Sequence, residues 1–323
     1  MKGSYQIIIQ NRRIRYDFTI RRNITIIRGD SASGKTQLIE LLLAFERRNG
    51  DSGVTLSCDK ACVVLGENRW EENLKLIHDS IVFIDEGADY VATDLFSRAV
   101  AASDNYYVII TRHALPNLPY SVEEIYGIRI SEKYAGLKQT YNEFYHLYGN
   151  VGEDSVEDVQ SVIVEDSNAG FAFFSEAVNH SVSISSANGK SSIPESVRCL
   201  PEEEIVLVVA DGAAFGSEME RMERLILTGR RIAMYLPESF EWIILRSGLI
   251  EDGEVEAVLA CPEKTIDSAE YLSWEQFFTA FLVKKTEGTY LKYSKSRLNP
   301  AYLQKKERMA IKNVMQVIRG VMK

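Results

Sequence analysis

The sequence predicts an α/β protein with two regions that each alternate strands and helices. Apolar runs typical of buried strands recur between residues 5 and 115 and again between 161 and 236, and segments with helical spacing separate them. The length of 323 residues exceeds that of one ordinary domain. Alternation of this kind is typical of a parallel sheet covered by helices on both faces.

In the first region, residues 5–10 and 14–20 predict a β-hairpin at the N-terminus. The pattern predicts further strands at 24–28, 61–66, 81–84 and 106–110. It predicts helices after residue 36, at 69–78 and near 91–101. Because residues 149–154 are typical of a turn or linker, we expect a first domain, with a parallel sheet, at 1–150.

The second region predicts a smaller α/β domain. Strands are expected at 161–164, 181–185, 205–210 and 232–236, with helices at 168–178, 192–199 and 217–228. Such a run forms a self-sufficient unit with a parallel sheet. From about Ser273 the pattern becomes helical and basic. We therefore expect a second domain at 151–265 and a basic helical C-terminal segment at 266–323.

Composition and cysteine usage favour a cytoplasmic protein. Hydrophobic residues make up 46% of the chain and charged residues 26%, as in globular proteins. No apolar run approaches the roughly 18 residues of a membrane span, and no signal-peptide pattern opens the sequence. Cys58 and Cys62 form a lone CxxxC without a second pair, which favours two small residues near a strand over a zinc site.

The charge of the chain is unevenly distributed. The net charge is −9, but residues 284–323 contain eleven Lys or Arg against Glu287 and Glu307, so this segment carries about +9. Within 290–298 tyrosines alternate with cations, so the segment could neutralise phosphates and stack on bases. The basic segment therefore predicts either contact with nucleic acid or an ordinary solvated helix face. An apolar stripe that includes Ile311 and Ile318 favours docking on the protein body, on a second copy in a homodimer, or on a partner protein.

The strongest motif lies between the strand at 24–28 and the helix that follows it. GDSASGKT fits GxxxxGK[ST] at every fixed position and comprises Gly29, Asp30, Ser31, Ala32, Ser33, Gly34, Lys35 and Thr36. The glycines let backbone N–H groups face phosphates, and the helix dipole adds positive potential. Lys35 would contact the β and γ phosphates, and the Thr36 hydroxyl would ligate Mg²⁺. The motif predicts a nucleoside triphosphate site, and the lack of an NKxD guanine motif favours ATP.

Two other strands end in residues suited to hydrolysis. After the strand at 81–84, Asp85 is expected to hold Mg²⁺ and Glu86 to orient the attacking water, although two solvated acids are the plainer alternative. After the strand at 106–110, Thr111 is the first choice for a γ-phosphate sensor, with Arg112 and His113 as further candidates and a surface turn as the alternative. Together these residues predict a Mg²⁺-dependent ATPase.

Residues 5–115 resemble the ATPases of the ABC and OLD-type group. The resemblance rests on the N-terminal hairpin, the P-loop, the apolar strand ending in Asp85 and Glu86, and the polar sensor strand. It implies a P-loop NTPase fold. The LSGGQ-like signature and the long coiled-coil insertion of that group are not found in this sequence.

Residues 162–238 resemble the Toprim-type domain that is fused to OLD-family ATPases. The resemblance implies that Glu165 and Asp211, which follow the first and third strands of this region, hold Mg²⁺ for phosphodiester chemistry. Ala213 stands where that family has the second Asp of a DxD pair, and the candidates to replace it are Asp166, Glu218 and Glu241. An active nuclease, a degenerate Toprim-like domain for binding or regulation, and an unrelated domain whose acids cap helices all stay open.

The leading hypothesis is an ATPase whose nucleotide cycle controls a nucleic-acid-directed Toprim-like domain. The alternative is a non-nucleolytic, ATP-dependent regulatory protein that acts on a partner protein, and Ala213 favours it. A small-molecule kinase is a further rival, against which the Asp85–Glu86 pair counts.

Overall fold

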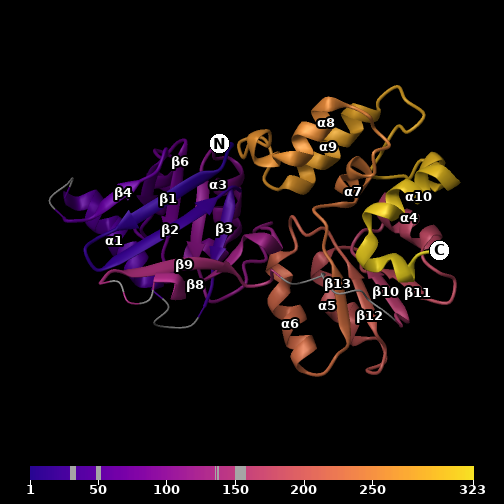
Figure 1. The fold of residues 1–323 in the computed structure, drawn as a ribbon, viewed down its shortest axis with the longest axis horizontal. Coiled ribbons are helices and arrows are strands. Elements are labelled where there is room, and N and C mark those ends of the chain that lie inside the picture. Colours follow the sequence, from indigo (N-terminus) through magenta and orange to yellow (C-terminus); the bar gives the residue numbers. More distant parts are fainter. Residues whose placement is uncertain (30–33, 49–51, 135, 137, 150–157) are drawn as a thin grey trace. The chain divides into compact units, whose positions relative to one another are not determined.

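The computed structural model divides the chain into two compact units. It describes all residues except 30–33, 49–51, 135, 137 and 150–157 (Figure 1). Unit 1 comprises Met1–Tyr148 and Cys261–Leu272, and unit 2 comprises Gly149–Ala260 and Ser273–Lys323. The predicted limits of 1–150, 151–265 and 266–323 differ from this division at the C-terminal end.

The segment Cys261–Leu272 belongs to unit 1, and hydrogen bonds connect it to residues near the N-terminus. The α-amino group of Met1 pairs with Asp267 at 2.9 Å, and the side chain of Asn23 donates to the carbonyl oxygen of Leu272 at 2.6 Å. The chain therefore returns to unit 1 before it enters the C-terminal helices of unit 2.

Unit 1 contains a nine-stranded sheet with the order β4-β1-β2-β9-β8-β3-β7-β6-β5. Its strands are β1 (Tyr5–Gln10), β2 (Ile14–Ile20), β3 (Ile24–Ile27), β4 (Thr55–Ser57), β5 (Ala61–Val64), β6 (Ser80–Ile84), β7 (Tyr106–Ile110), β8 (Ile125–Ile130) and β9 (Thr140–His146). The run from β8 to β5 is parallel, whereas β1 pairs antiparallel with β2 and β4, and β8 with β9. The prediction of a parallel sheet is therefore confirmed for the run from β8 to β5 and wrong for the sheet as a whole. The sheet is mixed because β9 joins the N-terminal hairpin to the parallel strands.

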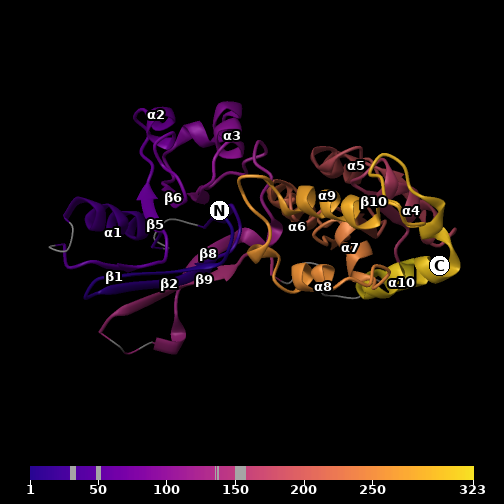
Figure 2. The same cartoon turned by 90° about the horizontal axis from the view of Figure 1, so that it is seen from above.

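The sheet of unit 1 curls around the helix α1 (Lys35–Arg48), which lies between the β1–β2 hairpin and β5 (Figure 2). Buried side chains from both ends of the sheet and from α1 form one core, including Ile9, Phe18, Leu38, Leu42 and Phe83. The other helices of unit 1 are α2 (Trp70–Leu74) and α3 (Asp94–Ala101). Because the apolar face of α1 packs against the sheet, Lys35 at the start of α1 lies close to the end of β6.

Unit 2 contains a four-stranded parallel sheet with the order β11-β10-β12-β13. Its strands are β10 (Ser161–Val164), β11 (Ser183–Ser186), β12 (Val206–Val209) and β13 (Ile232–Tyr235). Its helices are α4 (Ala169–Ala177), α5 (Ile193–Arg198), α6 (Met219–Leu227), α7 (Phe240–Arg246), α8 (Gly253–Ala260), α9 (Trp274–Thr286) and α10 (Lys305–Val314). The predicted α/β alternation is confirmed here, with the strands where the apolar runs place them. Among the helices of the described residues, none is both long and apolar enough to cross a membrane.

From Ser273 onward, the C-terminal segment packs within unit 2. Helix α7 contacts both α9 and α10, and Ile311 and Ile318 of the predicted apolar stripe are buried. Tyr293 is also buried, with 2% of its surface exposed, so the expectation that it stacks on bases is wrong. Its apolar surroundings and its hydrogen bond to Glu241 explain the burial.

Candidate nucleotide site and carboxylate cluster

The residues predicted to handle a nucleotide follow three neighbouring strands of unit 1. β7 pairs in parallel with β3 on one side and with β6 on the other. The carboxyl ends of these strands therefore meet at one edge of the sheet, where α/β proteins bind ligands. Gly29 follows β3, Glu86 follows β6 and Arg112 follows β7. Asp30, Ser31, Ala32 and Ser33 lie outside the described residues.

Both fixed glycines of the predicted P-loop have left-handed backbone angles. The φ angle is 137° at Gly29 and 91° at Gly34. The hydroxyl of Tyr16, on β2, donates to the carbonyl oxygen of Gly34 at 2.6 Å. A Cβ atom at Gly34 would lie 2.9 Å from this hydroxyl, so both the φ angle and the space require glycine. Sequence reasoning missed Tyr16, although the alternation in 14–20 places it on the buried side of the strand.

One carboxylate lies between two cations at this edge. Lys35 begins α1 and is 5% exposed, and its ammonium group donates to the carbonyl oxygen of Gly29. It lies 3.8 Å from one oxygen of Glu86, whose other oxygen pairs with Arg112. Two positive charges thus face one negative charge, which leaves a net positive site suited to phosphate.

The structure brings Arg112, rather than Thr111, to the charged cluster. The Thr111 hydroxyl donates to the carbonyl oxygen of His113 at 3.0 Å and accepts its N–H at 3.1 Å. These two hydrogen bonds stabilise the turn after β7. Arg28 donates to the carbonyl oxygen of Arg112 at 3.1 Å and supports the same turn.

The predicted magnesium ligands of unit 1 are Thr36 and Asp85. Thr36 is exposed in the first turn of α1, and Asp85 accepts the N–H of Glu86 at 2.8 Å. Within the described part of the chain, no group of three or more His, Cys, Asp and Glu is arranged to hold a metal. Mg²⁺ commonly binds through one or two protein ligands plus phosphates and water. Thr36 and Asp85 therefore fit Mg²⁺ as part of a nucleotide complex.

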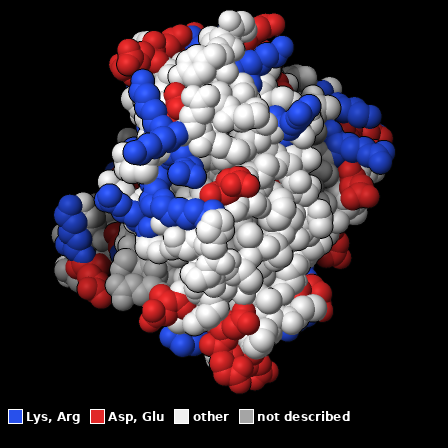
Figure 3. Space-filling view, turned by 90° about the vertical axis from the view of Figure 1, so that its right-hand side faces the viewer, with Lys and Arg blue, Asp and Glu red and all other residues white. Residues whose placement is uncertain are grey.

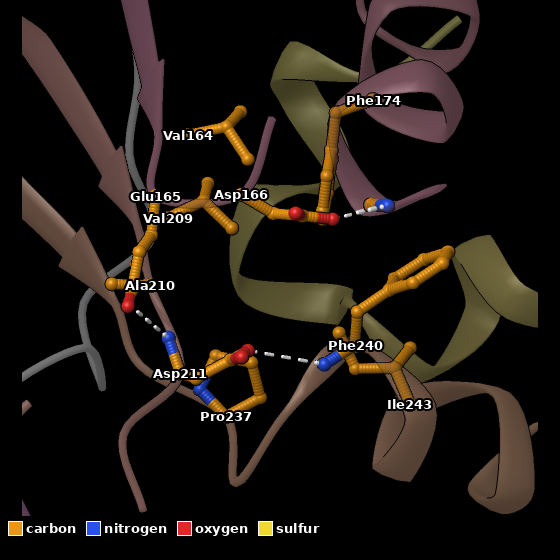
Figure 4. Close-up of a pocket in the computed structure, with 11 residues that line it drawn as sticks. Val164, Glu165, Asp166, Phe174, Val209, Ala210, Asp211, Pro237, Phe240 and Ile243 are labelled. Carbon is orange, nitrogen blue, oxygen red and sulfur yellow. Dashed lines mark hydrogen bonds between the residues drawn. The ribbon is translucent and has the colours of Figure 1, made fainter. Parts of the chain in front are cut away.

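In unit 2, Glu165 and Asp211 follow adjacent parallel strands, β10 and β12. The N–H of Asp211 donates to the Glu165 carboxylate at 3.0 Å, and the N–H of Phe240 donates to the Asp211 carboxylate at 3.2 Å (Figure 4). Burial raises the pKa of Glu165 to about 7 and the pKa of Asp211 well above its ordinary value. The two predicted residues therefore lie together, in a site with little solvent.

Two of the three acids proposed to replace the missing carboxylate have other partners. Asp166 accepts the N–H groups of Asn168 at 3.0 Å and Gly170 at 2.7 Å, and so stabilises the start of α4. Glu218 pairs with Arg221 at 2.9 Å. Asp166 therefore fits the alternative in which an acid after a strand caps the next helix.

The third acid, Glu241, lies close enough to Asp211 to raise its pKa, as does Glu275. Glu241 is 1% exposed and accepts the hydroxyl hydrogen of Tyr293 at 2.9 Å. Glu275 pairs with Lys295 at 2.5 Å. The carboxylate cluster of unit 2 therefore consists of Glu165, Asp211, Glu241 and Glu275.

Two lysines, Lys190 and Lys295, lie near the carboxylate cluster. Sequence reasoning assigned neither of them to it. Lys190 donates to the carbonyl oxygen of Ala214 at 2.7 Å, and burial lowers its pKa. Burial would also lower the pKa of Lys295, but Glu275, Glu241 and Asp211 together raise it above its ordinary value. No local pattern distinguishes Lys295 from the exposed cations around it, because its partners are distant in sequence.

Ala213 lies in a tightly packed loop. It is 3% exposed, and a Cβ atom at the preceding Gly212 would lie 2.3 Å from the carbonyl oxygen of Leu236. The position at which the Toprim-type resemblance implies a second carboxylate is therefore occupied by a small, buried, apolar side chain.

A scan against protein-family models finds no match for this chain, and a search of the curated proteins finds none that is significantly similar. The functional argument therefore rests on the residues and their geometry.

Proposed function

We propose that unit 1 binds ATP with Mg²⁺ and hydrolyses it, as a P-loop NTPase similar to the ABC and OLD-type group. The observation that supports this most is the charged cluster of Lys35, Glu86 and Arg112 at the edge of the sheet where the P-loop sequence lies. A motif match alone is a hypothesis, whereas this cluster joins residues from three separate strand ends.

In this proposal, Lys35 and the N–H groups of the P-loop hold the phosphates. Thr36 and Asp85 hold Mg²⁺, which neutralises phosphate charge when bound. The incoming γ-phosphate competes with Glu86 for both cations. Lys35 and Arg112 then turn to the phosphate, and Glu86 becomes available to orient the attacking water.

The first test is ATP turnover by the wild type, Lys35→Ala and Glu86→Gln. We expect each substitution to lower kcat/KM by at least about 100-fold, the scale of one lost transition-state contact. Glu86→Gln should retain nucleotide binding, because the lost group acts on water. Lys75→Ala and Glu71→Gln change exposed residues of the same unit and should leave turnover unchanged. Wild-type turnover in both site variants, or no ATP binding by the wild type, would exclude the proposal.

We further propose that the nucleotide state of unit 1 controls contact between unit 2, a Toprim-like domain, and nucleic acid. Six of the eleven cations in residues 284–323 are exposed, namely Lys284, Lys292, Arg297, Lys305, Lys306 and Arg319. Figure 3 shows a face on which Lys and Arg side chains gather beside a broad area without charged side chains. Exposed cations can bind phosphate backbones without sequence preference.

The alternative is a regulatory protein that acts on a protein partner. It is favoured by cations of the C-terminal segment that have partners within unit 2. Lys285 pairs with Asp252 and Glu254, and Lys312 donates to the carbonyl oxygens of Met322 and Lys323.

Fluorescence anisotropy with labelled double-stranded DNA, single-stranded DNA and RNA separates the two functions. For a nucleic-acid contact, Lys292→Ala and Arg297→Ala should each weaken binding and reduce the slope of log K against log salt by about 1. Glu287→Ala, a change at an exposed acid in the same segment, should not weaken binding. No binding to any of the three ligands, with and without ATP, would favour the regulatory function.

A further inference from the structure

The carboxylate cluster of unit 2 lies where the Toprim-type resemblance implies divalent metal. Hard cations such as Mg²⁺ need carboxylate oxygens that converge on one point. In this cluster the oxygens are directed to donors of the protein itself. The N–H of Asp211 donates to Glu165, and the N–H of Phe240 donates to Asp211. Figure 4 shows that Glu165, Asp166 and Asp211 each face a different backbone N–H.

The two remaining acids of the cluster are also engaged, in both cases by the segment that follows α9. Tyr293 donates its hydroxyl hydrogen to Glu241 at 2.9 Å, and the ammonium group of Lys295 lies 2.5 Å from Glu275. Each of the four carboxylates thus has a donor in unit 2.

The space beside the strand ends is small. The cavity lined by Glu165, Asp166 and Asp211 has a volume of about 20 Å³, and apolar side chains such as Phe174, Phe240 and Ile243 form much of its wall. That volume admits about one water molecule. Mg²⁺ usually keeps several waters, which this cavity cannot hold. Within the described residues no metal-binding group of three or more His, Cys, Asp and Glu is found. As folded, these residues do not fit a hydrated divalent ion.

We propose that Lys295 is a built-in cation that supplies the positive charge of a divalent metal in this cluster and thereby excludes the metal. Its ammonium group pairs with Glu275 and lies within electrostatic reach of Glu241 and Asp211. Lys190, close to Glu165 and Glu275, contributes a second positive charge. Buried carboxylates are stable only when paired with positive charge or hydrogen-bond donors, and here one chain supplies both.

The fold holds Lys295 in place through its backbone and through the residues before it. Its carbonyl oxygen accepts the N–H of Ala169, at the start of α4, at 3.2 Å. The N–H of Tyr293 donates to the hydroxyl of Thr286, at the end of α9, at 2.9 Å. The side chain of Lys295 is 41% exposed, so its charge can be removed without opening the core around Tyr293.

The test is a titration of nucleotide-free protein with Mn²⁺. The electron paramagnetic resonance signal of free Mn²⁺ measures how much of the ion is bound. Wild type and Glu165→Gln should give the same titration, because the cluster takes no metal while Lys295 is present. Lys295→Met should gain a Mn²⁺ site that is half-saturated at a concentration at least about tenfold below any at which wild type binds the ion, because one repelling charge is gone. The matched control is Lys292→Met, which removes the same charge from an exposed position of the same segment and should behave as wild type.

Thermal unfolding gives a second measurement that does not depend on activity. Lys295→Met should have a lower Tm than Lys292→Met without metal and should recover most of the difference in Mn²⁺, because binding to the folded state stabilises it. A wild-type Mn²⁺ site that Glu165→Gln removes would overturn the proposal, and this comparison holds even if Lys295→Met does not fold. A folded Lys295→Met that binds no more Mn²⁺ than Lys292→Met would overturn it as well. Because no nucleotide is present, neither result depends on ATP binding by unit 1.

Discussion

The two units place charged residues at the same position in the fold but with opposite charge balance. In unit 1, Glu86 lies between Lys35 and Arg112 at the carboxyl ends of parallel strands. In unit 2, Glu165 and Asp211 follow the strand ends. Glu241 on α7 and Glu275 on α9 complete the carboxylate cluster, which Lys190 and Lys295 accompany. The fold therefore determines where a ligand would bind, and the first residues after each strand determine which charge it must carry.

The two sites also differ in what remains available to a ligand. In unit 1, 56% of the Arg112 side chain and 28% of the Glu86 side chain are exposed, so a phosphate can approach the pair. In unit 2, Glu241 is buried, Asp211 is partly buried, and both are paired with donors of the same unit. This contrast supports a ligand-binding role for the first site and internal charge compensation for the second.

Of the effects expected from this contrast, the largest tests whether the unit 1 site binds phosphate. Arg112→Ala should lower kcat for ATP hydrolysis by about 10- to 100-fold, because it removes a cation placed to stabilise transferring phosphate. Arg112→Lys should retain part of the activity. Arg129 is the matched control, since it is exposed and pairs with Glu143 in the same unit, and Arg129→Ala should not change kcat. Equal kcat values for Arg112→Ala and Arg129→Ala would show that Arg112 does not stabilise the transferring phosphate and that its ion pair with Glu86 does not contribute to catalysis.

Local patterns predicted which strand ends of unit 1 carry the candidate nucleotide site, because its residues adjoin strands in the sequence. The P-loop glycines, Lys35 and Glu86 each follow an apolar run, and the structure places these runs side by side in one sheet. The strands β8 and β9 were missed. Their sequences, IYGIRI and TYNEFYH, mix polar residues with a central glycine or asparagine and lack a continuous apolar run.

The partners of the carboxylate cluster could not be predicted, because they come from far along the chain. Glu241 meets Tyr293 across 52 residues, and Glu275 meets Lys295 across 20. In the sequence, Tyr293 and Lys295 match a pattern of aromatic and basic residues that suits nucleic acid. Only tertiary packing distinguishes them from the exposed Lys292 and Arg297.

A smaller effect concerns a buried acid of unit 1 that lies outside the nucleotide site. Burial raises the pKa of Glu124 to about 7, although Arg22, Thr25 and Arg21 oppose the shift and Glu123 adds to it. Between pH 4.5 and 7 the folded state therefore binds a proton that the unfolded state has released. Stability should fall as pH rises through this window and level off above it, with a loss of about 2 kcal/mol between pH 5.5 and pH 8.0.

Urea unfolding of wild type and Glu124→Gln at pH 5.5 and pH 8.0 measures this contribution. The variant should lose less stability than wild type between the two pH values, because glutamine does not titrate. An equal loss in both proteins would assign the pH dependence to other groups, including the carboxylate cluster of unit 2.

The smallest expected effect compares two tyrosines that donate to glutamates in unit 2. Tyr293→Phe should destabilise unit 2 by about 1 kcal/mol, because Glu241 is buried and loses a donor. Tyr290 is 63% exposed and donates to Glu307 at 3.0 Å. Although Glu307 is 5% exposed, solvent reaches the Tyr290 side chain, so water can replace its hydroxyl. Tyr290→Phe should therefore change the free energy of unfolding by less than about 0.5 kcal/mol. If urea unfolding gave the same value for both variants, the Tyr293 hydroxyl would not be needed to compensate Glu241, and the cluster would depend on Lys295 and Lys190 for its charge balance.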